Sequence, residues 1–234
     1  MAVETELKLR IAPLQLARLK RHRFLKTCQL SSPHTRRLHN IYFDTPQLQL
    51  QQARMALRLR RDGRQWLQTL KGGGMVKAGL HQRNEWEVPV KRKALDFSSP
   101  ETASWLIRLP PPLTLQPVFV TDFIRNSRML AWHGALIELS MDQGEVRIDE
   151  CSVPICELEL ELKSGEPQQL YELALALLEV VPFALESVSK AELGYRLLAG
   201  DQGDPVKEEI LSPAQTDMLA RVLREQISSC KSHF

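Results

Sequence analysis

Polar and apolar residues alternate strictly along several segments of the chain, and this period of two predicts β-strands. Residues 156–163 read C-E-L-E-L-E-L-K, so Leu158, Leu160 and Leu162 lie on one face and three glutamates on the other, because successive side chains of a strand point to opposite faces. Carboxylates roughly 7 Å apart repel each other, and glutamate is a poor strand former. Solvent on an exposed face, or cations among the carboxylates, must offset these costs.

The same alternation, read together with turn signals, predicts about eight or nine antiparallel strands. The other predicted strands are residues 3–11, 36–45, 56–61, 65–71, 81–90, 116–125, 135–142 and 145–149. Helices are predicted over residues 14–28, from residue 46 onward, and over 98–108, 168–181 and 191–198. Asp62-Gly63 and Gln143-Gly144 are predicted turns, and Gly72 begins a predicted flexible loop. This spacing favours a closed or nearly closed antiparallel barrel.

The inner face of this barrel is predicted to be the charged one. The apolar helices at 14–25 and 170–181 need an apolar sheet face to pack on, so the leucines should point outward. Charges are also sorted by strand, with acids in 3–11 and 156–163 and bases in 56–61. Carboxylates bind Mg²⁺ or Mn²⁺, whereas arginine and lysine bind phosphate oxygens. The pattern therefore predicts a tunnel for a metal-bound polyanion.

Composition narrows the class of protein without naming a partner. The chain has 234 residues, a net charge of +3 and four scattered cysteines with no C-x-x-C pair. This cysteine pattern argues against a zinc site or a disulfide framework and indicates reduced thiols in the cytoplasm. The charged N-terminus is unlike a signal peptide, and no apolar run is long enough for a membrane span.

Six ordered motifs within residues 1–200 resemble the CYTH, or triphosphate tunnel metalloenzyme, family. They are E-x-E-x-K (residues 4–8), Y-F-D-T (42–45), A-L-R-L-R (56–60), T-L-K (69–71), R-N-E-W-E (83–87) and E-L-E-L-E (157–161), and S-K (189–190) follows them. G-L-H-Q-R, T-D-F-x-R and D-Q-G-E-V resemble the bacterial inorganic triphosphatases of this family more closely. The resemblance implies an α+β fold with an eight-stranded antiparallel barrel, helices packed on its outside, and metal-dependent hydrolysis of tripolyphosphate to pyrophosphate and phosphate. Phe123 departs from the pattern, because many members have lysine there.

The resemblance also implies roles for individual residues. The first metal ion, Mg²⁺ or Mn²⁺, is assigned to Glu4, Glu6, Glu159 and Glu161. Candidates for a second metal ion or for orienting the water are Glu85, Glu138, Asp142 and Glu157. The phosphate ligands are expected to be Arg58, Arg60, Lys71, Arg83, Arg125 and Lys190. Lys8 faces the same interior, where it contacts substrate or tunes a glutamate. His81 is interpreted as a packing or hydrogen-bonding residue, and the tryptophans as packing residues.

Alternatives remain open at this stage for both activity and domain organisation. Thiamine triphosphate, a nucleoside or RNA triphosphate, and adenylate cyclisation all suit the same tunnel, and a polyphosphate-binding module without turnover is the alternative from another class. Residues 1–200 are expected to form the CYTH domain and 201–211 a polar linker. Residues 212–234 are expected to form a helix that either docks on the tunnel or begins a CHAD-like domain. No membrane and no specific nucleic acid is expected as a partner.

Overall fold

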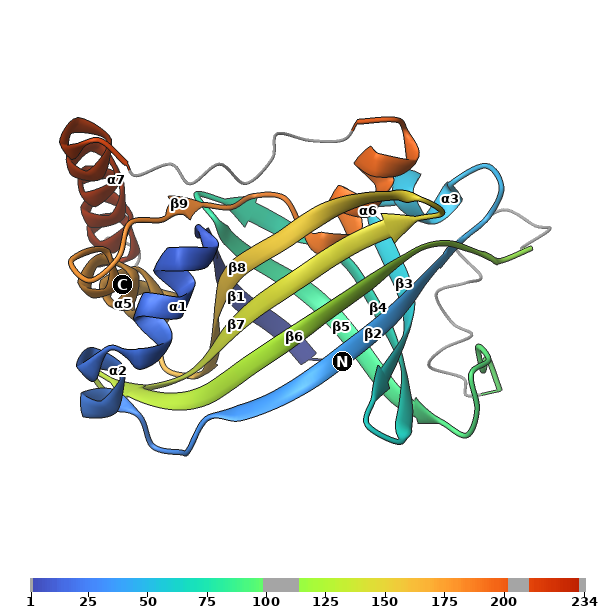
Figure 1. Cartoon of the computed structure of the whole chain (residues 1–234), viewed down its shortest axis with the longest axis horizontal. Coiled ribbons are helices and arrows are strands. Elements are labelled where there is room, and N and C mark those ends of the chain that lie inside the picture. The colour runs from blue at the N-terminus through green and yellow to red at the C-terminus, as the bar shows by residue number, and fades with distance from the viewer. Residues whose placement is uncertain (1, 99–113, 202–210, 232–234) are drawn as a thin grey trace.

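Eight antiparallel strands close into a barrel in the computed structural model, which describes residues 2–98, 114–201 and 211–231. The strands are β1 (Ala2–Arg10), β2 (His34–Asp44), β3 (Met55–Asp62), β4 (Gln65–Lys77), β5 (Leu80–Val90), β6 (Gln116–Trp132), β7 (Ala135–Ile148) and β8 (Cys151–Ser164). Their order is β5-β4-β3-β2-β6-β7-β8-β1, and pairing of β1 with β5 closes the ring (Figure 1). A short strand, β9 (Ala184–Leu185), pairs with the end of β1. The predicted α+β barrel is therefore confirmed.

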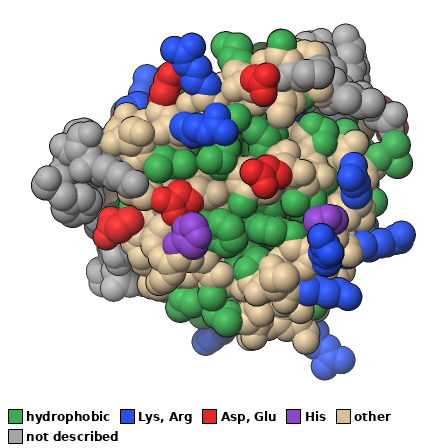
Figure 2. Space-filling model, turned by 90° about the vertical axis from the view of Figure 1, so that its left-hand side faces the viewer, with side chains coloured by type: hydrophobic (Ala, Val, Ile, Leu, Met, Phe, Trp, Pro, Cys, Tyr) green, Lys and Arg blue, Asp and Glu red, His purple; other side chains and the backbone are tan. Residues whose placement is uncertain are grey.

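The leucines of β8 point outward into a core that is covered by helices. Leu158 and Leu160 are fully buried there. The covering helices are α1 (Pro13–Arg21), α2 (Arg23–Cys28), α5 (Pro167–Leu178) and α7 (Pro213–Lys231). Figure 1 shows them gathered at one end of the barrel, and Figure 2 shows that apolar side chains remain visible among charged ones on this end. The prediction that leucines face outward and glutamates inward is confirmed.

Helix α6 (Lys190–Leu198) lies instead across the interior face of β6, β7 and β8. Its Tyr195 and Leu197 pack in one apolar cluster with Phe123 and Val153. Gly194 makes close packing possible, because a Cβ there would lie 2.3 Å from the ring of Phe119. This helix therefore differs from the others, since it covers an apolar part of the barrel interior.

One predicted turn and one predicted flexible loop, both at glycines, are wrong. The structure continues β7 through Gln143-Gly144, and the turn that joins β7 to β8 comes only after Ile148. Gly144 is there because β6 passes so close that a Cβ would lie 2.4 Å from the Cα of Phe123. Likewise, Gly72 does not begin a free loop, because β4 extends to Lys77 with a register shift between Gly72 and Met75.

Helix boundaries also differ from the prediction. Residues 14–28 form two helices, because His22 is extended between them and its Nδ1 accepts a hydrogen bond from the Phe24 amide. The short helix expected from residue 46 is α3 (Gln49–Gln52). The predicted helix at 98–108 and the predicted linker at 201–211 lie almost entirely outside the described residues.

The C-terminal helix α7 packs against α5 and the outer core. Leu223 is fully buried, whereas Met218 is 70 % exposed. The helix predicted for this segment thus packs on the tunnel domain through α5, and the proposed division into domains stays a prediction. No helix in the described part of the chain has the length and apolar character needed to cross a membrane.

Candidate active site

Charged side chains of all eight barrel strands and of α6 surround a cavity of about 270 Å³ inside the barrel. Every site residue predicted from the sequence lines this cavity except Asp142 and Glu157. The lining residues among them are Glu4, Glu6, Lys8, Arg58, Arg60, Lys71, Arg83, Glu85, Arg125, Glu138, Glu159, Glu161 and Lys190. Alternation within strands therefore brought these side chains to one face, as predicted, and barrel closure brought the strands together.

One wall of the cavity carries a row of carboxylates on three adjacent strands. Glu161 of β8 lies directly opposite Glu6 of β1 on one side and Glu138 of β7 on the other. Lys163 contacts Glu161 at 2.5 Å and Glu138 at 3.3 Å. Burial, and then the charges of Glu4 and Glu138, raise the pKa of Glu161 despite this lysine. The row is short of positive charge, and carboxylate oxygens are the donors that a hard divalent cation prefers. Among the described residues, however, only Asp142, Glu157 and Glu159 bring three such oxygens within 4.8 Å of one another, so the row would have to draw together around a cation.

Asp142, Glu157 and Glu159 form a second, deeper group whose carboxylate oxygens lie within 4.8 Å of one another. Burial alone would raise the pKa of Glu159, but Lys190, Lys8 and Arg125 hold it well below its ordinary value. The ion pairs are Lys8 with Glu157 and Glu159, both at 2.8 Å, Lys190 with all three acids, and Arg125 with Asp142 and Glu159. Three cations thus balance three carboxylates, in contrast to the Glu6–Glu161–Glu138 row.

The opposite wall is basic and has unused hydrogen-bonding capacity. Arg58 and Arg60 both come from β3, and the buried Nε of Arg58 has no hydrogen-bond partner in the described residues. Burial, and then the charges of Arg58 and Arg125, lower the pKa of Arg60 to about 10. An anion placed between these guanidinium groups would relieve their repulsion. The wall is therefore suited to binding phosphate.

Residues 2–195 match the model of the CYTH domain. The chain belongs to the CYTH domain family. It is 34 % identical over 201 residues to an inorganic triphosphatase of Haemophilus influenzae, a match that covers 84 % of this chain and 55 % of the relative. The chain thus spans about half the length of this curated relative.

Solved structures support the CYTH fold. A putative adenylyl cyclase from Hippeastrum, described as having a dominant triphosphatase activity, superposes with a TM-score of 0.61 and 19 % identity, covering 88 % of this chain and all of that one. A putative adenylate cyclase from Bacillus halodurans gives 0.53 and 18 %, covering 81 % and 97 %.

The CYTH motif Y-F-D-T holds α6 in place. The buried carboxylate of Asp44 accepts hydrogen bonds from the amides of Thr45 and Leu50 at 2.7 and 2.8 Å, and from the hydroxyl of Tyr195 at 2.8 Å. Ser189 caps α6 by accepting a hydrogen bond from the Glu192 amide. Asp44 therefore ties the β2 end to the helix that delivers Lys190 to the tunnel.

Several charged or polar residues that line the tunnel were not predicted from the sequence. They are Arg36, Tyr42, Asp62, Glu87 and Lys163. Tyr42 is buried beside Arg58, and although burial raises the pKa of its hydroxyl, Arg58, Arg60 and Lys190 lower it overall. The available signal was alternation, because Arg36 and Tyr42 share one face of β2 with Asn40.

The aromatic ring at the departure, Phe123, lies beside Lys190 in the tunnel. Phe123 lines the tunnel, and Nζ of Lys190 lies 4.8 Å from the centre of its ring. His81 is buried and contacts the Glu186 carbonyl through Nε2 at 3.1 Å, as expected for a hydrogen-bonding residue. None of the described tryptophans lines the tunnel.

Proposed function

We propose that this CYTH domain hydrolyses inorganic triphosphate to pyrophosphate and phosphate with a divalent cation, Mg²⁺ or Mn²⁺. The observation that carries the proposal is the pairing of a carboxylate row short of positive charge with a basic wall that has unpartnered donors. A bound triphosphate with its cation would satisfy both walls. The match to the Haemophilus inorganic triphosphatase supports the same chemistry.

The basic residues that would bind the phosphates come from several strands and from α6. Arg58, Arg60, Lys71 and Arg83 approach from β3, β4 and β5, and Arg125 and Lys190 approach from β6 and α6. Lys8 contacts the carboxylates of Glu157 and Glu159, both at 2.8 Å. We therefore assign Lys8 to positioning these carboxylates and to adding positive electrostatic potential at the bound phosphates. Fixed cations at the phosphates stabilise the charge that builds up as the P–O bond breaks.

The cation would be held by Glu4, Glu6, Glu159 and Glu161. When bound, it would neutralise phosphate oxygens and the developing charge of the leaving group. Glu4 contacts Lys71 at 2.5 Å and Glu161 contacts Lys163, so these lysines would give up carboxylate contacts and become available to phosphate.

Hydrolysis requires a water molecule aligned with the terminal phosphorus. Its oxygen forms a new P–O bond while the bond to pyrophosphate breaks, and its proton passes to a carboxylate. We assign water orientation to Glu138 and Glu85, because both line the tunnel. Asp142 and Glu157 lie behind the lining and would act by holding Lys190 and Lys8.

The test is phosphate release from tripolyphosphate, ATP and thiamine triphosphate, each with Mg²⁺ or Mn²⁺. Chelation should abolish release and either metal ion should restore it. Glu161→Gln should remove turnover and leave the fold intact, since it relieves carboxylate repulsion. Glu225→Gln on exposed α7 is the matched control and should retain activity. Full activity in chelator, or full activity of Glu161→Gln, would exclude this mechanism.

The wider setting is proposed on separate grounds. The four cysteines are free, which supports a reducing cytoplasmic location. The Haemophilus relative is longer than this chain, so a further domain, of the CHAD type by resemblance, would follow α7. Thiamine triphosphate and nucleotides are the alternative substrates that the same assay separates.

A further inference from the structure

A hollow on the outer side of the barrel continues from the mouth of the tunnel. Arg36 and Asp62 line both the tunnel and this hollow, which passes over the edge formed by β2, β3 and the turn between β3 and β4. We call it the rim groove, and its charged and ionisable lining residues are His34, Arg36, Arg37, His39, Arg61, Asp62 and Asp122. The two cavities are therefore contiguous through one ion pair, Arg36 with Asp62 at 2.7 Å.

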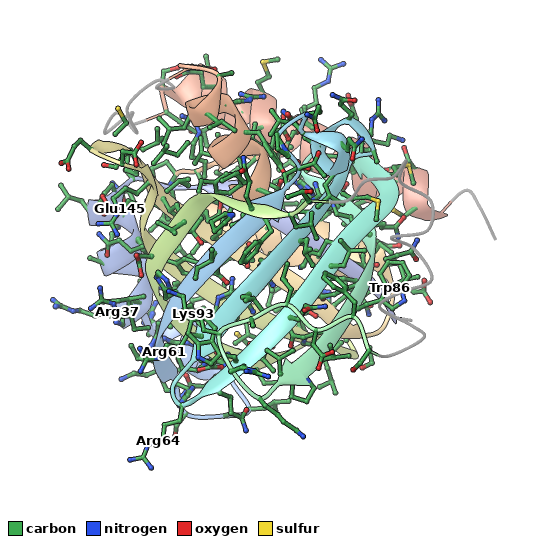
Figure 3. All side chains as sticks on the ribbon, turned by 90° about the vertical axis from the view of Figure 1, so that its right-hand side faces the viewer. Arg37, Arg61, Arg64, Trp86, Lys93 and Glu145 are labelled. Atoms are coloured by element: carbon green, nitrogen blue, oxygen red, sulfur yellow. The ribbon has the colours of Figure 1, made fainter. Side chains whose placement is uncertain are left out.

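The rim groove has an excess of positive charge that the protein does not neutralise. Asp62 is paired with Arg36, and Asp122 is paired with His39 at 2.8 Å. Arg37 and Arg61 are exposed and have no carboxylate partner among the described residues. Figure 3 shows both on the same side of the barrel, with Arg64 and Lys93 near them.

The arginines are arranged along a path that leads out of the tunnel. Arg61 lies opposite His39 in the β2–β3 register, so Arg37 and Arg61 are diagonal neighbours on the outer face, with Cβ atoms roughly 7–8 Å apart. Between them and the interior stands Arg36, whose buried Nε has no hydrogen-bond partner in the described residues. Cationic groups thus continue from Arg60 inside the tunnel to Arg37 outside it.

We propose that the rim groove binds the outer phosphates of a linear inorganic polyphosphate longer than three phosphates, while the end of that chain occupies the tunnel. The inference rests on the proposed function, because the tunnel must first accept a triphosphate unit. A linear polyphosphate repeats one charge per phosphate along a flexible chain, which suits arginines spaced along a path. A single-stranded nucleic acid suits it less, because the described lining has no phenylalanine, tyrosine or tryptophan for base stacking.

The test compares binding of tripolyphosphate with binding of a longer linear polyphosphate of uniform length, measured calorimetrically in chelator so that neither is consumed. The double variant Arg37→Gln/Arg61→Gln removes the two exposed guanidinium groups. It should bind the longer chain about three- to tenfold more weakly, because exposed charge contacts are individually weak, and bind tripolyphosphate unchanged. The control Arg221→Gln/Arg224→Gln removes the same charge from exposed positions of α7 and should change neither affinity.

Each outcome decides the question. Loss of affinity confined to the longer chain supports the rim groove. Unchanged affinity for the longer chain, an equal loss for both ligands, or tighter binding of a single-stranded oligonucleotide of equal charge overturns it. A parallel assay of phosphate release from tripolyphosphate with Mg²⁺ separates the two ideas. If the wild type releases no phosphate, the proposed function fails, whereas normal release with unchanged long-chain binding refutes the rim groove alone.

Discussion

Gly194 offers a direct test of how α6 is held against the barrel interior. A Cβ at this position would lie 2.3 Å from Cε2 of Phe119, a distance that real Cβ atoms do not adopt. The ring has little freedom to move, because it stacks on Tyr42 at 4.6 Å and meets Tyr195 edge-on at 5.1 Å between centroids. In Gly194→Ala, either α6 or this aromatic group must therefore shift.

Two effects of opposite sign set the magnitude. Replacing glycine by alanine in a free helix stabilises it by about 1 kcal/mol. Overpacking a tight interior costs about 1–3 kcal/mol. The net change in the free energy of unfolding should thus be a loss of up to about 2 kcal/mol. Activity should fall as well, because Lys190 begins the same helix and its Nζ lies 2.6 Å from Asp142 and 2.9 Å from Glu159.

The assay is denaturant unfolding combined with kcat/KM for tripolyphosphate. We expect kcat/KM to fall roughly tenfold or more, because small displacements of a catalytic group are costly. Glu192→Ala is the control on the exposed side of α6 and removes only a surface pair with Arg196, worth about 0.3–0.5 kcal/mol. A stabilisation of Gly194→Ala by about 1 kcal/mol with unchanged kcat/KM would refute this account of α6.

Three further predictions follow from other parts of the molecule. Tripolyphosphate should exceed ATP in kcat/KM by at least about tenfold, because the two aromatic rings that line the tunnel, Tyr42 and Phe123, are each only 3 % exposed and leave no free face to stack a base; a ratio near one would favour the nucleotide alternative. Burial, and then the charge of Arg83, lower the pKa of His81 from 6.5 to about 4. Between these two pH values the unfolded chain binds a proton that the folded chain does not, so the free energy of unfolding should fall by at most about 3 kcal/mol as pH falls from 6.5 to 4. An identical dependence of stability on pH in His81→Gln would contradict this. Peptide mapping after alkylation should find exposed Cys151 modified in the folded protein and buried Cys156 modified only after denaturation. Burial, and then the charge of Glu157, raise the pKa of Cys156 to about 12, which keeps its thiol protonated and unreactive. Rapid alkylation of Cys156 in the folded protein would show that it is not buried.

Alternation within strands was sufficient to predict which face of each strand is charged. In β8, Leu158 and Leu160 are fully buried in the outer core, and Glu159 and Glu161 line the tunnel. The argument succeeded because a strand has only two faces, so one well-supported assignment for the apolar face fixes the other. The inward-facing charged residues of β1, β3 and β8 followed from this assignment, whereas their individual roles came from the resemblance to the CYTH family.

Features that depend on the distance between strands were not predictable from the chain. Gly144 has the sequence context of a turn, but it is required by the close approach of β6. The three cations around Asp142 and Glu159 come from β1, β6 and α6, and their convergence depends on barrel closure. Sequence spacing contains no information about such contacts until the register between strands is known.

The charged and apolar parts of the barrel interior also explain how substrate would enter. Along β8, Val153 shares the inner face with Glu157 and Glu159. This face therefore changes from apolar at Val153 to charged at Glu157. Helix α6 packs on the apolar part, and its N-terminal Lys190 reaches the boundary with the charged part. A polyanion gains nothing from the apolar part, because desolvating its charges there is unfavourable. Arg36 and Asp62 line both the charged part and the rim groove, so the proposed path of a phosphate chain into the tunnel passes over these two residues.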